Sequence, residues 1–233
     1  MILLRSSHAV LRNRAHVLDG SMRDYDALLE MVGNRGFVLL GEATHGTLEF
    51  YRMRAQITRR LIDEQGFDAI AIEGDWPDTQ QLNRYVLGNA GIFLDMAFDQ
   101  YQRFPTWMWR NREVEAFAQW LHAYNASLPE TQRIGVHGLD LYSLYRSAEA
   151  VVSYLEQVDP QQAQAARELY ACLDHVRDPQ DYGHAAAAGL RPPCREAAAK
   201  LLMDLVRKAP EYRADRGRAK SDEQFLAERN AYV

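Results

Sequence analysis

The spacing of apolar residues divides the first 142 residues of the chain into strands and helices. Three short runs rich in aliphatic residues are typical of strands: GFVLL (36–40), FDAIAIE (67–73) and RIGVHG (133–138). Between the first two runs, residues 48–65 contain no Gly or Pro and have helical periodicity. The apolar positions that carry this periodicity are Phe50, Met53, Ile57 and Leu61. The succession predicts a βαβ unit, and hence a sheet that is parallel at least in part.

The rest of the chain has the periodicity of helices. Two are predicted between the second and third strands, over 78–88 and 111–125, on either side of the aromatic loop RFPTWMWRN. Past residue 142 every periodic segment is helical, and Pro, Gly or charged turns separate the segments. These segments are 143–158, 160–176, 192–209 and 221–233. We therefore expect an α/β fold class, with a partly parallel sheet and helical crossovers over residues 1–142 and an all-helical layer or subdomain over 143–233.

Composition restricts the compartment and the partners. With 47% apolar and 25% charged residues, the 233-residue chain is typical of a globular protein. A net charge of −5 offers no basic surface for nucleic acid or an acidic membrane. The four-residue apolar start is too short for a signal peptide and no later stretch resembles a membrane span, so we expect a cytoplasmic protein. Cys172 and Cys194 lack metal-ligand spacing and are expected to be unpaired thiols.

Acids and histidines follow all three predicted strands, in the segments GEATHG, EGDWPD and HGLD. The carboxyl ends of parallel strands lie at one edge of a sheet, where ligands of α/β proteins bind. We therefore expect the side chains of these segments to converge on one site. The candidates are Glu42, His45, Glu73, Asp75, His137 and Asp140.

The segment after the first strand has further features of a reactive site. Thr47 is placed to cap the following helix, which puts His45 beside the positive end of the helix dipole. Arg54 falls within the apolar arc of that helix, where a guanidinium needs an acid partner, and Glu42 or Glu73 is the candidate. Tryptophans near the strand ends, Trp107 and Trp109, are candidates for a wall of the site or for core anchors.

Four segments together resemble the erythromycin esterase family: GEATHGTLEFYRMRAQITRRLI, IEGDWPD, RFPTWMWRN and GLDLYSL. The likeness runs from about residue 30 to the last residue. It implies that His45 is the general base that activates water for lactone hydrolysis. The other positions that correspond to functional residues of the family are Glu42, Arg54 and Glu73.

The residues and the resemblance together predict a hydrolase that acts on a small-molecule ester or lactone without metal or cofactor. Imidazole groups titrate near neutral pH, which suits His45 to take a proton from water. Glu42 or Glu73 would orient it, while Arg54 would hold the acids or polarise the carbonyl. No Gly-x-Ser-x-Gly segment is present to support a serine nucleophile. The residues expected to bind substrate are Asp75, Trp76, Trp109 and His137.

Two other functions stay open at this point. A metal-dependent hydrolase could use Glu42, His45, Glu73 and Asp140 as hard ligands, and the wider superfamily resembles metal-dependent Tiki-type proteases. A non-catalytic relative could instead bind haem or another ligand. Metal analysis distinguishes the first alternative, and ester hydrolysis distinguishes the second.

The family resemblance also implies that the chain is a fragment, because family members are longer. The last helix opens with a capping-box pattern, Ser221 and Gln224, and has no C-terminal cap. Three strands are few for a parallel sheet in a chain of this length, where about five or six are usual. We expect an exposed apolar surface, through which the chain could form a homodimer, and no hydrolysis by the fragment alone.

Overall fold

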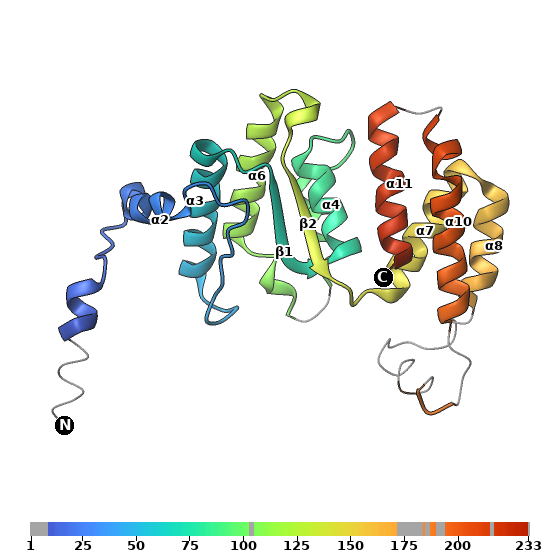
Figure 1. Cartoon of the computed structure of the whole chain (residues 1–233), viewed down its shortest axis with the longest axis horizontal. Coiled ribbons are helices and arrows are strands. Elements are labelled where there is room, and N and C mark those ends of the chain that lie inside the picture. Colours follow the sequence, from blue (N-terminus) through green and yellow to red (C-terminus); the bar gives the residue numbers. More distant parts are fainter. Residues whose placement is uncertain are drawn as a thin grey trace.

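The chain forms an α/β part that is followed by a bundle of helices (Figure 1). The computed structural model describes residues 9–102, 105–171, 184, 187–189, 194–214 and 217–232. In chain order, the described elements before the second strand are η1 (Met22–Tyr25), α2 (Asp26–Val32), α3 (Leu48–Gln65), β1 (Ala69–Asp75), α4 (Trp76–Val86), α5 (Leu94–Phe98), η2 (Thr106–Met108), α6 (Arg112–Ala126) and η3 (Glu130–Gln132). They are followed by β2 (Gly135–Asp140), α7 (Leu144–Val158), α8 (Pro160–Tyr170), α10 (Arg195–Ala214) and α11 (Gly217–Tyr232).

The sheet consists of β1 and β2, which pair in parallel. Ala69 pairs with Gly135 and Ile72 with Gly138, and the register then shifts so that Asp75 pairs with Asp140. Helices α4, α5 and α6 make the crossover between the two strands. The structure therefore confirms the α/β fold class, the parallel pairing and the helical crossover.

The expectation of a strand over residues 36–40 is wrong, because this segment has no ladder hydrogen bonds. Its side chains do alternate as a strand's would: Val38 and Leu40 pack against the cluster formed by α2 and α3, while Phe37 and Leu39 are almost fully exposed. Pairing requires neighbouring strands about 4.8 Å apart. A pocket of about 290 Å³ is lined by this segment and also by β1, so the two chain segments flank a space instead of pairing.

The two faces of the sheet have different surroundings. Ile70, Ile72 and Val136 face a core that α4 and α6 complete with Leu82 and Leu121. Residues 69, 71 and 73 alternate with these inward positions and are exposed. Parallel sheets are usually covered on both faces, so the exposure of one face of β1 is an unusual feature of this part of the chain.

Gly138 determines how closely β1 and β2 approach each other where the register shifts. A Cβ atom on Gly138 would lie 2.4 Å from the carbonyl oxygen of Gly74 and 2.6 Å from that of Asp75. These are backbone atoms, which cannot rotate away as a side chain can. Gly138 therefore allows the end of β1, which carries Glu73 and Asp75, to lie against β2.

Helix α3 has the bounds that its periodicity predicts, residues 48–65. Ile57 and Leu61 pack against Leu29 of α2, and this contact buries the apolar face of the helix. The helix ends at Gly66, whose left-handed conformation (φ 72°) suits glycine because it has no Cβ. Burial of one face and a glycine stop are both visible in sequence, which is why this element is predicted well.

The helical part has a core of its own. Figure 1 shows α7, α8, α10 and α11 grouped together. Val151 and Leu155 of α7 pack with Leu201 and Leu205 of α10, and α8 and α11 add small residues. Within the described residues, no helix is long and apolar enough to cross a membrane.

Two expectations about the helical part are wrong. Helix α11 begins at Gly217, so Ser221 lies inside it and does not cap it. Gln224 is fully buried, and hydrogen bonds satisfy its amide: the oxygen accepts one from the Tyr154 hydroxyl, and the nitrogen donates one to the carbonyl of Leu205 (3.2 Å). Cys194 is disulfide-bonded, not a free thiol, and the companion prediction for Cys172 lies outside the described residues.

Candidate functional site

The loop before α3 is held from two sides. Thr47 is the N-cap residue, as predicted, although its side chain makes no capping hydrogen bond. One turn into the helix, the Tyr51 hydroxyl donates a hydrogen bond to the backbone carbonyl of His45 (2.7 Å). Tyr51 is buried, and burial raises the pKa of its hydroxyl, with the nearby Glu42 carboxylate adding to the effect. The hydroxyl therefore stays protonated as a donor and fixes the backbone that carries His45.

Glu42 joins the imidazole of His45 to the guanidinium of Arg54. One carboxylate oxygen contacts His45 Nδ1, and the other forms an ion pair with Arg54 Nη2 at 2.8 Å. The side chain of Glu42 is only 10% exposed and that of Arg54 23%, while His45 is 43% exposed. The prediction that Arg54 requires an acid partner is confirmed, with Glu42 as the partner. The Arg54 guanidinium also lies over the ring of Tyr51, 4.8 Å from its centre.

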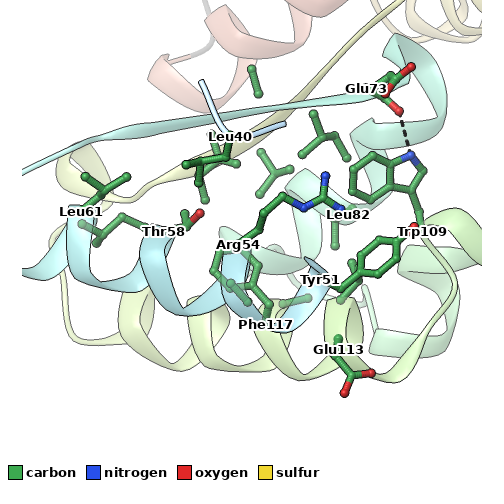
Figure 2. Close-up of a pocket in the computed structure, with 18 of the residues that line it drawn as sticks. Leu40, Tyr51, Arg54, Thr58, Leu61, Glu73, Leu82, Trp109, Glu113 and Phe117 are labelled. Atoms are coloured by element: carbon green, nitrogen blue, oxygen red, sulfur yellow. Dashed lines mark hydrogen bonds between the residues drawn. The ribbon is translucent and has the colours of Figure 1, made fainter. Parts of the chain in front are cut away.

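Glu42, Tyr51 and Arg54 line a pocket of about 290 Å³ between residues 38–42, α3, β1 and α6, whereas His45 lies outside its lining and reaches it only through its contact with Glu42. Figure 2 shows Arg54 extending from α3 toward the end of the pocket where Glu73 and Trp109 lie. Trp109 Nε1 donates a hydrogen bond to the backbone carbonyl of Glu73 (2.8 Å), which fixes the indole beside the end of β1. Most of the remaining wall is aliphatic, so the pocket has one apolar end and one charged end.

A smaller cavity of about 170 Å³ adjoins the charged end, and Glu73 and Trp109 line both spaces. Asp75 lines the smaller cavity too, but its carboxylate accepts hydrogen bonds from the Tyr142 amide (2.7 Å) and the Ser143 hydroxyl (2.6 Å). Asp75 therefore anchors the loop that follows β2. Asp140 lines the same cavity.

Two of the predicted substrate-binding residues lie elsewhere. The rings of Trp76 and His137 stack with their centres 6.2 Å apart, and Trp76 also contacts Phe225 of α11 edge-on. Neither residue lines the two pockets beside Glu73. Trp107 is half exposed and approaches Gly46 of the loop before α3. The fold thus brings Glu42, Arg54, Glu73 and Trp109 to one pocket, with His45 in contact with Glu42, and it leaves Trp76 and His137 aside.

Sequence reasoning missed Tyr51 and Glu113. Tyr51 lies three residues before Arg54 on the same helix, so the helical spacing alone could have placed the two side chains together. Glu113 of α6 lines the pocket and pairs with Arg52 at 3.3 Å, a contact between distant segments that no local pattern signals. Among the described residues, no three His, Cys, Asp or Glu side chains are grouped closely enough to hold a metal ion.

A curated relative covers part of the chain. The erythromycin esterase type II of Escherichia coli is 27% identical over 123 residues, which are 53% of this chain and 27% of that protein. The chain thus spans about a quarter of the length of this relative.

Two solved structures share the fold. The crystal structure of a succinoglycan biosynthesis protein is 24% identical and superimposes with a TM-score of 0.65, over 95% of this chain and 53% of that one. The crystal structure of a protein from Bacillus cereus, 21% identical, gives the same TM-score over 96% of this chain and 53% of that one. The chain therefore spans about half the length of both structures.

A family match covers most of the chain. The erythromycin esterase family matches residues 62–233, a range that begins inside α3. The matched range includes Glu73 and Trp109, whereas Glu42, His45 and Arg54 precede it, so their grouping rests on the geometry described above. With about three quarters of its length in the match, the chain belongs to the erythromycin esterase family.

Proposed function

We propose that the pocket beside α3 is part of an ester or lactone hydrolase site in which His45 is the general base. The observation that carries this proposal is the position of the Glu42 carboxylate, between His45 Nδ1 and the guanidinium of Arg54. A carboxylate at Nδ1 favours the tautomer with the proton on that nitrogen, which leaves the lone pair of Nε2 to accept a proton from water. The half-exposed imidazole is accessible to that water.

Arg54 has two roles in this proposal. Its ion pair with Glu42 keeps the carboxylate in one orientation, and the carboxylate then stabilises the imidazolium that forms when His45 accepts a proton. The guanidinium has further N–H groups, which extend toward the end of the pocket that holds Glu73 and Trp109 (Figure 2). A carbonyl oxygen bound there would receive positive charge as it becomes an oxyanion.

The reaction follows from these positions. Water attacks the carbonyl carbon while its proton passes to His45 Nε2, and a tetrahedral oxyanion forms beside Arg54. Collapse of the intermediate breaks the bond to the alcohol oxygen, which takes the proton back from the imidazolium. An ester yields a carboxylic acid and an alcohol, and a lactone yields a single hydroxy acid. The aliphatic wall of the pocket suits an apolar acyl or alcohol group next to the reacting carbonyl.

The family supports hydrolysis as the class of reaction, since its name describes an esterase. The test is to measure acid release from a panel of simple esters, small lactones and a macrolide lactone by the gene product that carries this chain. The macrolide is included because the Escherichia coli relative is named an erythromycin esterase.

His45→Ala is the decisive variant. We expect a loss of about 10²- to 10⁴-fold in kcat/KM, because that is the usual contribution of general acid–base catalysis. Thermal stability should change little, since the side chain is half exposed. His16→Ala, at an exposed histidine far from α3 in the sequence, is the matched control. Undiminished hydrolysis by a folded His45→Ala protein would overturn the assignment, and activity that requires an added divalent cation would favour a metal-dependent hydrolase instead.

A further inference from the structure

The pocket of about 290 Å³ lies along the edge of β1 that does not face β2. Five consecutive residues of this strand, 69–73, line it, whereas a pocket over one face of a strand would be lined by alternate residues only. The opposite wall includes Val38 and Leu40, from the segment that flanks β1 without pairing to it. In Figure 2 the strand leads along the pocket to Glu73, at the end toward which Arg54 extends.

The hydrogen bonds of β2 determine which backbone groups of β1 point into the pocket. Successive residues of a strand direct their N–H and C=O groups to opposite edges. The Val136 N–H donates to Asn83 Oδ1 (2.9 Å), so the backbone of Val136 faces away from β1, and its partner Ile70 makes the ladder bonds of this pair. Ala71, the next residue, therefore directs its N–H and C=O groups to the other edge, where the pocket lies.

A side chain already pairs with this edge of the strand. Trp109 Nε1 donates to the backbone carbonyl of Glu73 (2.8 Å), two residues after Ala71 and hence on the same edge. Within the described part of the chain, no hydrogen bond from this side reaches the backbone of Ala71, which is exposed in the pocket. Ala71 thus presents one donor and one acceptor to a molecule that enters. Free edge groups of this kind bind extended chains that contain amides.

The distance to the reactive end and the size of the pocket define how long such a chain is. Ala71 lies two residues before Glu73, about 7 Å at the usual rise of a strand. An extended chain of two residues covers this distance, so an amide paired with Ala71 leaves the following carbonyl group at the end where Arg54 and Glu73 lie. The volume is near the lower limit of the range of about 300 to 1,000 Å³ that is usual for small-molecule sites, which suits a short chain.

We propose that the substrate is a peptidyl ester or lactone, whose acyl part lies extended along β1 and pairs with Ala71. This inference rests on the proposed function, because β1 supplies binding and the His45 site supplies the hydrolysis. The substrate runs parallel to β1, with its ester toward Glu73. In a parallel ladder, the Ala71 N–H donates to the carbonyl before the paired substrate residue, and the Ala71 C=O accepts from the N–H after it. The aliphatic lining suits small apolar substrate side chains.

The kinetic test uses the gene product that carries this chain and three methyl esters: that of N-acetyl-alanyl-alanine and those of its two N-methylated forms. Methylation of the second alanine nitrogen removes the donor to the Ala71 carbonyl, and it should lower kcat/KM about three- to tenfold, as expected for one hydrogen bond. The first alanine nitrogen faces away from β1, so its methylation is the matched control and should have a smaller effect. Equal kcat/KM for the unmethylated ester and the second-nitrogen form would overturn the proposal.

Proline substitutions test the direction of the backbone groups. Ala71→Pro removes the N–H that faces the pocket and keeps the ladder bonds to β2, and proline is tolerated where the N–H of an edge strand points outward. The variant should fold and lose about three- to tenfold in kcat/KM for the unmethylated ester, whereas Ala71→Ser, which keeps the N–H, should lose less. Ile72→Pro removes a ladder donor and should melt at a lower temperature than Ala71→Pro. Equal melting temperatures would overturn the assignment of the edge.

Nuclear magnetic resonance of the whole chain separates a failure of this proposal from a failure of the hydrolase. In the free chain the Ala71 amide should exchange with solvent faster than that of Ile72. Its resonance should shift when N-acetyl-alanyl-alanine methylamide, which contains no ester, is added. A shift without hydrolysis of any ester would support the binding and reject the hydrolase, whereas hydrolysis without a shift at Ala71 would overturn this proposal alone. Slow exchange of the Ala71 amide in the free chain would show an edge that is already paired and would also overturn it.

Discussion

Tyr51 holds the backbone of His45 through a 2.7 Å hydrogen bond, while Glu42 holds the imidazole of the same residue. The two contacts fix different parts of His45, and both come from residues whose side chains are largely buried. The position of the imidazole therefore depends on the first turn of α3 as well as on the loop that carries it.

Tyr51→Phe should remove the first of these contacts, the hydrogen bond to the His45 backbone, and leave the contact of Glu42 with the imidazole. The ring stays, so Arg54 keeps its place above it, but the His45 carbonyl loses its donor. We expect a cost of about 1 kcal/mol in unfolding free energy and a fall in kcat with little change in KM, because the base is less well positioned. Urea denaturation and steady-state kinetics measure the two effects. Tyr232→Phe, at an exposed tyrosine, is the control. A fall in stability with unchanged kcat would show that the hydroxyl only supports the fold.

Arg54→Ala should leave the largely buried Glu42 carboxylate without its arginine partner. Breaking a fully buried ion pair costs about 3 to 5 kcal/mol, but Arg54 is partly exposed, so we expect about 2 kcal/mol. Arg54→Met keeps the apolar stem over Tyr51 and should be less destabilising, yet both variants should lose hydrolysis. Denaturation curves and kcat/KM on the ester panel test this. Wild-type activity in Arg54→Met would contradict the proposed role at the oxyanion.

Asp159 makes the helical part sensitive to acid. Its carboxylate caps α8 through the amide of Gln162 and accepts hydrogen bonds from Lys208 (2.9 Å) and Tyr212 (3.0 Å). Partial burial works against the charge, but the contacts of Lys208, Gln162 and Tyr212 outweigh it and hold the pKa of Asp159 below its ordinary value of 3.8. A carboxyl whose pKa is lower in the folded than in the unfolded state contributes stability at pH values above its unfolded-state pKa. That contribution is lost as the pH falls through its folded-state pKa.

The parent should therefore lose stability below about pH 4, and Asp159→Asn should lose less over the same interval. At pH 7 the variant should be less stable by about 1 to 2 kcal/mol, because it lacks a charged cap and its contact with Lys208. Thermal melts across acidic pH values provide the measurement, and Asp95→Asn, at an exposed aspartate of α5, is the control. Identical acid dependence in parent and Asp159→Asn would refute the argument.

Phe37 and Leu39 should promote self-association. Both are almost fully exposed on the segment before the reactive loop. An exposed apolar surface of this kind favours contact with a second copy. Sedimentation velocity over a range of concentrations should show reversible dimers, and Leu39→Lys should shift the chain toward monomer. Val17→Lys, at another exposed apolar residue, should not. A chain that stays monomeric throughout the range would remove the homodimer proposal.

Local features of the sequence predict the fold well, and contacts between distant segments limit the prediction. The bounds of α3 follow from one buried face and the glycine that ends it. Residues 36–40 have the composition and alternation of a strand, but strand formation also requires a neighbour at pairing distance, which no local pattern encodes. Ser221 and Gln224 match a capping box and so predict a helix that starts at Ser221, but α11 begins at Gly217 and Gln224 is a buried partner of the Tyr154 hydroxyl of α7.

The same distinction applies to the site. Arg54 on an apolar helix face needs a carboxylate, and this requirement predicts Glu42 or Glu73 as its partner, of which the structure shows Glu42. Polar residues after the strands predict the edge of the sheet at which they lie but not the direction of each side chain. They therefore do not distinguish Glu73, which lines the pocket, from His137, which stacks on Trp76. Alternation within a strand sends successive side chains to opposite faces, and a shift in register such as the one after Ile72 moves that pattern.

The close approach at Gly138 has a genetic consequence. Any missense change in this codon adds a Cβ where two carbonyl oxygens already lie within 2.6 Å, so β2 would have to move away from the end of β1. Natural selection should then remove variants at this position as strictly as variants of a reactive residue, although Gly138 lines neither pocket beside Glu73. In a saturation mutagenesis screen, intolerance at Gly138 would mark a limit on backbone spacing and not a chemical role.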